Sequence, residues 1–158
     1  MSRIAIYARV STDDQNVIQQ VNILTEWCAR QSHDIVKVVA DTESGRKPLT
    51  ERKKFKALLI DSGDWEAILV YNLDRLTRNW DDVTFIERFF RENWNRCQLI
   101  SMQDTIDLSN ASGRMMFRIK MAVACYMPED MREKQIVGIQ RAKQQGKYTG
   151  GKVGRTWK

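Results

Sequence analysis

The chain has 158 residues, 26 Lys and Arg against 20 Asp and Glu, a formal net charge of +6, and 42% apolar residues. This length and apolar content are typical of a single domain whose hydrophobic core is large enough to be stable without disulfides. Because no run of about 18 apolar residues is present and the first residues do not open a signal peptide, we expect a cytoplasmic protein with no membrane contact.

Cysteine and histidine are sparse. Cys28, Cys97 and Cys125 are far apart in apolar surroundings, so we expect reduced core thiols and no metal site. His33 is the only histidine and lies in a polar turn. Any chemistry is therefore expected to run without histidine.

The positive charge is concentrated at the end of the chain. Residues 132–158 hold eight basic residues and one acid, a net +7, so the other 131 residues sum to −1. A basic arm on a neutral body predicts contact with nucleic acid, and a solvated helix face is the alternative. The residues predicted to contact DNA are Arg132, Lys134, Arg141, Lys143, Lys147, Lys152 and Arg155.

Apolar periodicity predicts alternating strands and helices over the first 110 residues. Strands are expected at 4–10, 35–40, 67–71 and 98–102, helices at 15–30, 51–62 and 81–93, and a mobile loop at 41–50. The near-continuous apolar run at 4–10 is typical of a central strand buried on both faces. This alternation predicts an α/β fold, a three-layer sandwich around a mostly parallel sheet of four or five strands.

The pattern changes from Ala111 onward. A broad apolar stripe at helical spacing consists of Met115, Met116, Ile119, Val123, Tyr126 and Met127. This long helical region either forms a partner surface or packs on the sheet. We therefore expect an α/β body at 1–110, a long helical region at 111–145 for oligomerisation and DNA contact, and a flexible basic linker at 146–158.

The first strand ends in a reactive pattern. Arg9 interrupts the apolar run and Ser11 follows it, which places a cation beside a hydroxyl where the strand emerges. This arrangement suggests an oxygen nucleophile held near an anion. Alternatively, Ser11 or Thr12 caps the next helix, and the spacing from Thr12 to Gln15 fits a capping box.

A second cluster of charged residues follows the third predicted strand. Ligands of open parallel sheets bind beyond the carboxyl ends of the strands, where Ser11 and the segment 72–78 meet. Asp74 to Arg78 is one predicted helical turn, so the guanidiniums of Arg75 and Arg78 can point to one side. Arginine forks suit phosphoryl chemistry because they bind two phosphate oxygens at once. A structural Asp74–Arg75 ion pair is the alternative.

Together these motifs resemble the serine site-specific recombinases, the resolvase/invertase family. The segments 7–12 (Tyr-Ala-Arg-Val-Ser-Thr) and 73–78 (Leu-Asp-Arg-Leu-Thr-Arg) match two signatures of that family. Residues 104–109 and 113–116 resemble the segment that leads into its long helix, and 138–151 resembles the end of that helix and the start of the linker. The resemblance covers essentially the whole chain.

The resemblance implies a role for each matching residue. Ser11 would attack the scissile phosphate and leave a 5′-phosphoserine link with a free 3′-hydroxyl. Arg9, Arg75 and Arg78 would bind the phosphate, with no metal or other cofactor, and Asp74 would orient the arginines or help move protons. Arg52 matches a further family arginine, with Arg46 as its competitor, and Gln15 and Gln20 match glutamines near the site.

The resemblance also implies the partners. The family acts on double-stranded DNA, without a small-molecule substrate, as a homodimer that becomes a tetramer at synapsis. It cuts four strands, rotates half of the tetramer and religates. Its long helix carries the dimer contact and tracks over the minor groove.

Two features depart from the family pattern. Met127-Pro128 stands where the family commonly has a Glu-Arg pair, and proline removes a helical hydrogen bond, so we predict a kink or break near 126–128. The sequence also shows no helix-turn-helix domain after the linker. We therefore expect weak, largely electrostatic DNA binding by this chain alone.

Two competing functions follow from the same residues. The Met127-Pro128 departure suggests a catalytically silent DNA-binding or regulatory dimer, although the intact set of Arg9, Ser11 and the 74–78 segment favours an enzyme. A phosphate-binding flavodoxin-like or receiver-like module is the third hypothesis, because Asp13-Asp14 follows the first strand. The arginine cluster disfavours that module, which needs acidic residues and a metal.

Overall fold

The computed structural model describes residues 2–9, 14–61, 63–93, 95–104, 106–108 and 110–145, with the backbone alone for 14–16, 128–130, 132 and 133. The chain divides into two compact units, residues 1–125 and the residues from Tyr126 onward. The elements in chain order are β1 (Arg3–Arg9), α1 (Asp14–Arg30), β2 (Asp34–Asp41), the 3-10 turn η1 (Leu49–Glu51), α2 (Lys53–Ile60), β3 (Ala67–Val70), α3 (Leu73–Leu76), α4 (Trp80–Glu92), β4 (Gln98–Ser101) and α5 (Ala111–Gln144).

The sheet is parallel throughout its four described strands, in the order β2-β1-β3-β4. Strand β1 lies inside the sheet because apolar side chains cover both of its faces. Ile4 and Ile6 join one core cluster, while Ala5 and Tyr7 join the other. The predictions of a central first strand and of a mostly parallel sheet are confirmed.

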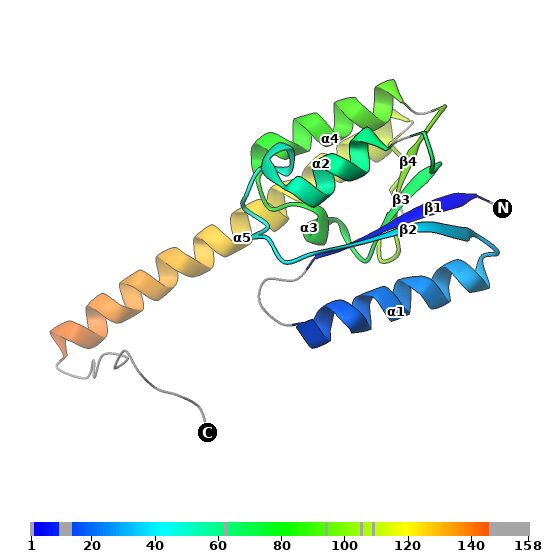
Figure 1. The fold of residues 1–158 in the computed structure, drawn as a ribbon. Helices are drawn as coiled ribbons and strands as arrows, with labels where there is room; N and C mark the ends of the chain where they lie inside the picture. Colours follow the sequence, from blue (N-terminus) through cyan, green and yellow to red (C-terminus); the bar gives the residue numbers. More distant parts are fainter. Residues whose placement is uncertain are drawn as a thin grey trace. The chain divides into compact units, whose positions relative to one another are not determined.

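Helices cover both faces of this sheet, which gives the predicted three layers (Figure 1). On one face, Leu24 and Cys28 of α1 pack in the cluster that contains Ile4 and Ile6. On the other face, α2, α4 and the first turns of α5 contribute larger side chains, among them Phe55, Phe90 and Phe117. The α/β fold expected from the alternating pattern is therefore confirmed.

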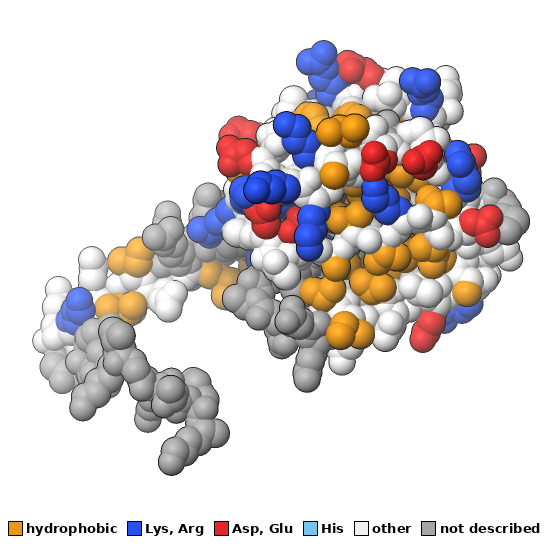
Figure 2. Space-filling model, in the orientation of Figure 1, with side chains coloured by type: hydrophobic (Ala, Val, Ile, Leu, Met, Phe, Trp, Pro, Cys, Tyr) orange, Lys and Arg blue, Asp and Glu red, His pale blue; other side chains and the backbone are white. Residues whose placement is uncertain are grey.

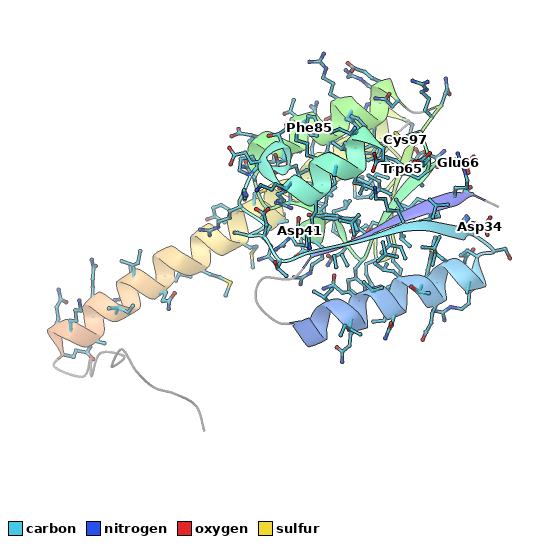
Figure 3. All side chains as sticks on the ribbon, in the orientation of Figure 1. Asp34, Asp41, Trp65, Glu66, Phe85 and Cys97 are labelled. Carbon is cyan, nitrogen blue, oxygen red and sulfur yellow. The ribbon has the colours of Figure 1, made fainter. Side chains whose placement is uncertain are left out.

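Strand β2 is an outer strand of the sheet, and its two ends lie at the amino and carboxyl edges of the parallel strands. Figure 3 shows Asp34 and Asp41 at opposite ends of this strand. Val36 and Val38 are 44% and 47% exposed on it. Apolar side chains gather over the body in the view of Figure 2, with lysines, arginines and acids interspersed above them.

Helix α5 runs without a break from Ala111 to Gln144 and continues through Pro128. The predicted break at 126–128 is therefore wrong. Proline removes one hydrogen bond and costs about 3 kcal/mol, but in a helix of 34 residues the remaining hydrogen bonds on both sides sustain the α conformation. The predicted kink at this point stays a prediction.

The apolar stripe of α5 does not pack on the sheet within residues 1–125. Met115, Met116, Ile119 and Val123 are all more than half exposed. Phe117 and Met121, from the other side of the same turns, are fully buried in the core instead. Of the two alternatives for the stripe, packing on the sheet is wrong for these residues, and a partner surface stays a prediction.

Cys28 and Cys97 are buried free thiols, and Cys125 is half-buried. Among the described residues, no three His, Cys, Asp or Glu side chains are grouped so that they could hold a metal ion. None of the described helices is long and apolar enough to cross a membrane.

Candidate active site

Most of the predicted catalytic residues converge at the carboxyl edge of the sheet. Arg9 ends β1, and α3 with Asp74 and Arg75 begins three residues after β3 ends. Ser11 lies outside the described residues, two positions after Arg9, and the side chain of Gln15 is likewise outside them. The sequence-based argument that these strand ends meet at one edge therefore agrees with the fold.

The guanidinium of Arg9 is buried against the backbone of α3. Its Nε donates to the carbonyl of Arg75 at 2.8 Å and its Nη2 to the carbonyl of Asp74 at 3.3 Å. Nη1 donates to the carbonyl of Glu43 at 3.4 Å, and the residue is only 2% exposed. Three of its five N–H groups therefore donate to main-chain carbonyls, and the other two have no acceptor among the residues that the structure describes.

Arg52 is fully buried and its donors are all occupied. Nη1 donates to the carbonyl of Leu76 at 2.6 Å and to the hydroxyl of Tyr7 at 3.3 Å. Nη2 donates to the carbonyls of Gly45 and Lys47, and Nε donates again to Lys47. These five bonds account for every N–H of the guanidinium.

These two arginines together cap the C-terminal end of α3. The last carbonyls of a helix lack backbone partners within the helix and need other donors. Here the carbonyls of Asp74, Arg75 and Leu76 accept from Arg9 and Arg52. The predicted phosphate contact of Arg52 stays a prediction. The position of Arg52 next to the end of α3 is fixed by its hydrogen bonds. Arg46 is exposed on the same loop.

The predicted helical turn ends earlier than expected. Helix α3 stops at Leu76, and Thr77 is extended with φ −152° and ψ 161°. The turn ends because guanidinium donors occupy its carbonyls, while the amide of Arg78 donates to Gly45 at 2.8 Å. The prediction of one helical turn from Asp74 to Arg78 is therefore wrong at its end.

Arg75 and Arg78 nevertheless lie beside one carboxylate. Arg78 Nη2 donates to Asp74 Oδ2 at 2.9 Å, and Arg75 Nε lies 3.9 Å from Oδ1, too far for a hydrogen bond. Both arginine side chains are about one-third exposed, at 33% and 35%. They are the members of the described cluster that a phosphate from solvent can reach while Arg9 and Arg52 keep their backbone bonds.

Besides Asp104 Oδ1, which forms an ion pair with Lys120, three buried acceptor oxygens of the carboxyl-edge residues have no hydrogen-bond donor among the residues that the structure describes. They are Gln20 Oε1, Asn72 Oδ1 and Asp74 Oδ1. The amide nitrogen of Gln20 donates to the carbonyl of Arg9 at 3.5 Å. A buried acceptor without a partner is costly, so this edge is suited to receive a hydroxyl or another donor.

A second buried network supports the site and was not predicted from the sequence. Tyr7 donates to Asp41 Oδ2 at 2.9 Å and accepts from Arg52. Burial raises the pKa of Tyr7, so the phenol stays neutral. Asp82 accepts from the amide of Leu49 at 3.0 Å and from the hydroxyl of Thr77 at 2.5 Å.

These groups could have been suspected only from their types and positions. Asp41 ends an apolar strand and Tyr7 is a polar tip within another. Nothing in a linear pattern shows that an aspartate in the fourth helix will hold the loop that precedes the second helix.

Several cations surround the buried Arg9. Burial together with the charges of Arg52 and Arg78 lowers the pKa of Arg9 to about 10. The group is still protonated at neutral pH. The site therefore presents a standing concentration of positive charge, which favours an anion in it.

The basic residues predicted to contact DNA are described only in part. Lys134, Arg141 and Lys143 are exposed on α5. The side chain of Arg132 and all of Lys147, Lys152 and Arg155 lie outside the described residues.

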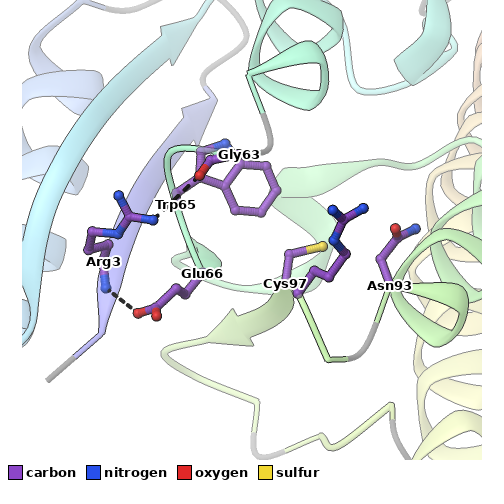
Figure 4. Close-up of a pocket in the computed structure, with 7 residues that line it drawn as sticks. Arg3, Gly63, Trp65, Glu66, Asn93 and Cys97 are labelled. Carbon is purple, nitrogen blue, oxygen red and sulfur yellow. Dashed lines mark hydrogen bonds between the residues drawn. The ribbon is translucent and has the colours of Figure 1, made fainter.

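A pocket lies at the opposite edge of the sheet. This cavity has a volume of about 340 Å³. Figure 4 shows Arg3, Glu66 and Cys97 among its lining residues. Arg3 begins β1 and Cys97 precedes β4, so the cavity is at the amino ends of the strands. It is separate from the arginine cluster.

Comparison with known proteins identifies the family. Residues 4–148 match the family model described as the resolvase N-terminal domain. The chain belongs to the resolvase family. This resolvase-family chain is 31% identical to the transposon Tn917 resolvase of Enterococcus faecalis over 144 residues. The match covers 91% of this chain and 73% of that protein. It is equally similar, at 31% over 144 residues, to the DNA-invertase hin of Salmonella typhimurium, with 91% and 70% covered.

Solved structures of serine recombinase catalytic domains have a fold similar to that of this chain. The N-terminal catalytic domain of TP901-1 integrase matches with a TM-score of 0.59 and 27% identity, covering 83% of this chain and 97% of that one. The C-terminal catalytic domain of ISC1926 TnpA, an IS607-like serine recombinase, matches with a TM-score of 0.55 and 27% identity, covering 90% and 96%. The prediction of a serine recombinase catalytic fold is confirmed.

Proposed function

We propose that this chain catalyses site-specific recombination of double-stranded DNA with Ser11 as the nucleophile. The Ser11 oxygen bonds to the scissile phosphorus, the bond from phosphorus to the 3′-oxygen breaks, and a 5′-phosphoserine link remains. The serine proton is removed, and the departing 3′-oxygen gains a proton. Reversal by the 3′-hydroxyl of a partner strand rejoins the DNA and frees the serine, so that no bond energy is lost.

One observation carries this proposal. Arg9, two residues before Ser11, is bonded to the backbone of Asp74 and Arg75. The end of β1 is therefore fixed to the segment that presents Asp74, Arg75 and Arg78. The chain segment that carries Ser11 therefore leaves β1 next to the Asp74 carboxylate and the two partly exposed guanidiniums.

The contacts support different roles for the four arginines. Arg75 and Arg78 are accessible and would bind the non-bridging oxygens, where charge builds in the transition state. Arg9 would add its remaining N–H groups, and Arg52 would hold α3 from below. These arginines, rather than a metal, would supply the positive charge in this proposal.

Asp74 and the glutamines would complete the site. Asp74 Oδ2 orients Arg78, and its buried Oδ1 is open to a donor, which fits an acceptor for the Ser11 proton. Gln20 is bonded to the carbonyl of Arg9 and would steady the same strand end. Gln15 would lie near the site, as its place in the sequence suggests.

DNA binding and assembly complete the proposal. The basic residues of 132–155 would contact phosphates, and the exposed stripe from Met115 to Val123 would form a homodimer contact, with a tetramer at synapsis. The body at 1–110 would do the chemistry, 111–145 would assemble on DNA, and 146–158 would act as a linker. Free buried thiols fit a reducing cytoplasm.

The proposal is tested on supercoiled DNA that carries the recombination site of the element encoding this chain. Quenching during reaction should trap protein joined to 5′ ends, in the wild type and not in Ser11→Ala. Arg75→Gln should also lose the adduct while keeping its DNA affinity. Bound DNA with no adduct in the wild type under activating conditions would favour the silent DNA-binding dimer.

A further inference from the structure

Asp104, between β4 and α5, is a buried carboxylate that the chemistry above does not use. The residue is 5% exposed. Its Oδ2 accepts from the backbone amide of Leu73 at 2.9 Å and from the hydroxyl of Ser101 at 2.8 Å. One carboxylate oxygen therefore joins the end of β4 to the first residue of α3.

The other oxygen faces helix α5. Lys120 forms an ion pair with Asp104 Oδ1. The lysine side chain is 47% exposed while that of Asp104 is 1% exposed, so the charge of the carboxylate is compensated from the surface side. A buried carboxylate is costly unless it is paired and hydrogen-bonded, so the ion pair with Lys120 stabilises Asp104 in this position.

The amide that Asp104 binds is structurally important. Helix α3 is a single turn, and Asn72 stands at its capping position without a side-chain capping bond. Asp104, 31 residues away, accepts instead from the amide of Leu73, the first helical residue, which has no acceptor within the helix. Because Arg9 and Arg52 hold the other end of the turn, α3 is fixed at its start by Asp104 and at its end by arginines.

We infer that Asp104 is a positioning residue for the arginine segment 73–78, and that Lys120 makes this position depend on α5. The inference rests on the proposed function, in which 73–78 binds the scissile phosphate. A shift of Lys120 with its helix would move or release Asp104, free the amide of Leu73 and loosen the turn that presents Arg75. Cleavage would thus respond to the placement of α5.

The chain offers a matched control two residues away. Arg118 also pairs α5 with the body, through Nε to Glu87 Oε2 at 2.6 Å and Nη2 to Oε1 at 3.0 Å. Its partner lies on α4 and has no bond to the arginine segment. Lys120→Met and Arg118→Met therefore each remove one ion pair of α5, and only Lys120 is linked to α3, through Asp104.

The experiment compares these variants in the full chain by amide exchange, DNA affinity and single-turnover cleavage. Lys120→Met should speed exchange at Leu73 and slow cleavage on the order of tenfold or more, with DNA affinity unchanged. Arg118→Met should leave the exchange of Leu73 and the cleavage rate at wild-type values. Lys120→Arg, which keeps the charge, should restore both.

Equal behaviour of Lys120→Met and Arg118→Met in exchange and in cleavage would overturn the inference, because a general anchoring of α5 would then explain both. Faster exchange at Leu73 without slower cleavage would overturn it as well. If the wild type itself gives no cleavage that depends on Ser11, the proposed function fails. The exchange of Leu73 still decides whether Asp104 and Lys120 hold the turn.

Discussion

Arg9 donates from Nε to the main-chain carbonyl of Arg75 at 2.8 Å, although the two residues are 66 positions apart. The side chain of Arg9 is bonded to the backbone of Arg75, not to a carboxylate. The contact therefore holds two arginines near each other without neutralising either charge. The accumulated charge is part of the reason why the pKa of Arg9 falls to about 10, after burial itself. A phosphate would relieve the repulsion among these cations.

Gly45 sets the position of Arg9. A Cβ at this residue would lie 2.7 Å from Nη2 and 2.9 Å from Cζ of Arg9. Gly45→Ala should therefore displace the guanidinium from α3 and lower the single-turnover cleavage rate by about tenfold or more, since misplaced groups are costly in catalysis. The measurement is formation of the covalent adduct over time.

Gly63→Ala is the control for this change, because nothing lies within 4 Å of a Cβ at that residue. It should cleave at the wild-type rate. Equal rates for Gly45→Ala and wild type would contradict the assigned importance of the Arg9 position.

Arg52 and Arg75 should separate stability from activity. Arg52→Met leaves the carbonyls of Gly45, Lys47 and Leu76 without their donors in a buried site and should lower the free energy of unfolding by about 3 kcal/mol. Arg75→Gln changes a side chain that is one-third exposed and should alter the free energy of unfolding by less than about 0.5 kcal/mol.

Urea denaturation and the adduct assay measure the two effects. Arg75→Gln should fold like the wild type and lose the adduct. A large loss of stability in Arg75→Gln would instead support a structural Asp74–Arg75 ion pair.

The layers of the fold could be predicted because apolar runs report burial directly. The run from Ile4 to Val10 indicated a central strand, and β1 is buried on both faces from Ile4 onward. Convergence of Arg9 with the 74–78 segment followed from parallel topology alone. The boundaries of the helices were less predictable, since α3 ends where arginine side chains from two other segments occupy its carbonyls.

The supporting contacts could not be predicted for a physical reason. Asp82, Asp104 and Tyr7 act through backbone amides and buried hydrogen bonds that depend on three-dimensional packing. At Pro128 a local preference was misleading. Proline favours a break in a helix, but α5 continues through this residue. The apolar stripe of α5 likewise gave helical periodicity without showing that its members would be exposed.

Gly113 should not tolerate a side chain. A Cβ there would lie 1.7 Å from the carbonyl oxygen of Asp107, which is backbone and cannot move aside alone. Gly113→Ala should lower the free energy of unfolding by about 2 kcal/mol or more. Thermal and urea denaturation give the value.

Gly138→Ala is the matched change in the same helix, since nothing lies within 4 Å of its Cβ. It should raise the stability of the helix by about 0.5–1 kcal/mol. A loss of stability equal to that of Gly113→Ala would show that the loss is not specific to the contact with Asp107.

The buried thiols predict how stability changes with pH. Burial raises the pKa of Cys28 and of Cys97 above the ordinary value of 9.0. Above pH 9 the unfolded chain releases these protons while the folded chain retains them, so the free energy of unfolding should fall as pH rises. The lowered pKa of Arg9 acts in the opposite direction, and only above about 10.

Urea denaturation between pH 9 and about 10 measures this dependence, and removal of the thiols separates their contribution from that of buried Tyr7, whose raised pKa acts in the same direction. The double variant Cys28→Ala, Cys97→Ala should show a flatter dependence on pH than the wild type. The same slope in both proteins would contradict the assignment to these thiols.

The attachment site on the DNA adduct tests the central claim most directly. Adduct from a quenched reaction is digested with nuclease and protease, and tandem mass spectrometry locates the remaining nucleotide on the protein. The account predicts a nucleotide joined through its 5′-phosphate to the Ser11 oxygen. Attachment to any other residue, or cleaved DNA whose protein carries no nucleotide at all, would contradict it.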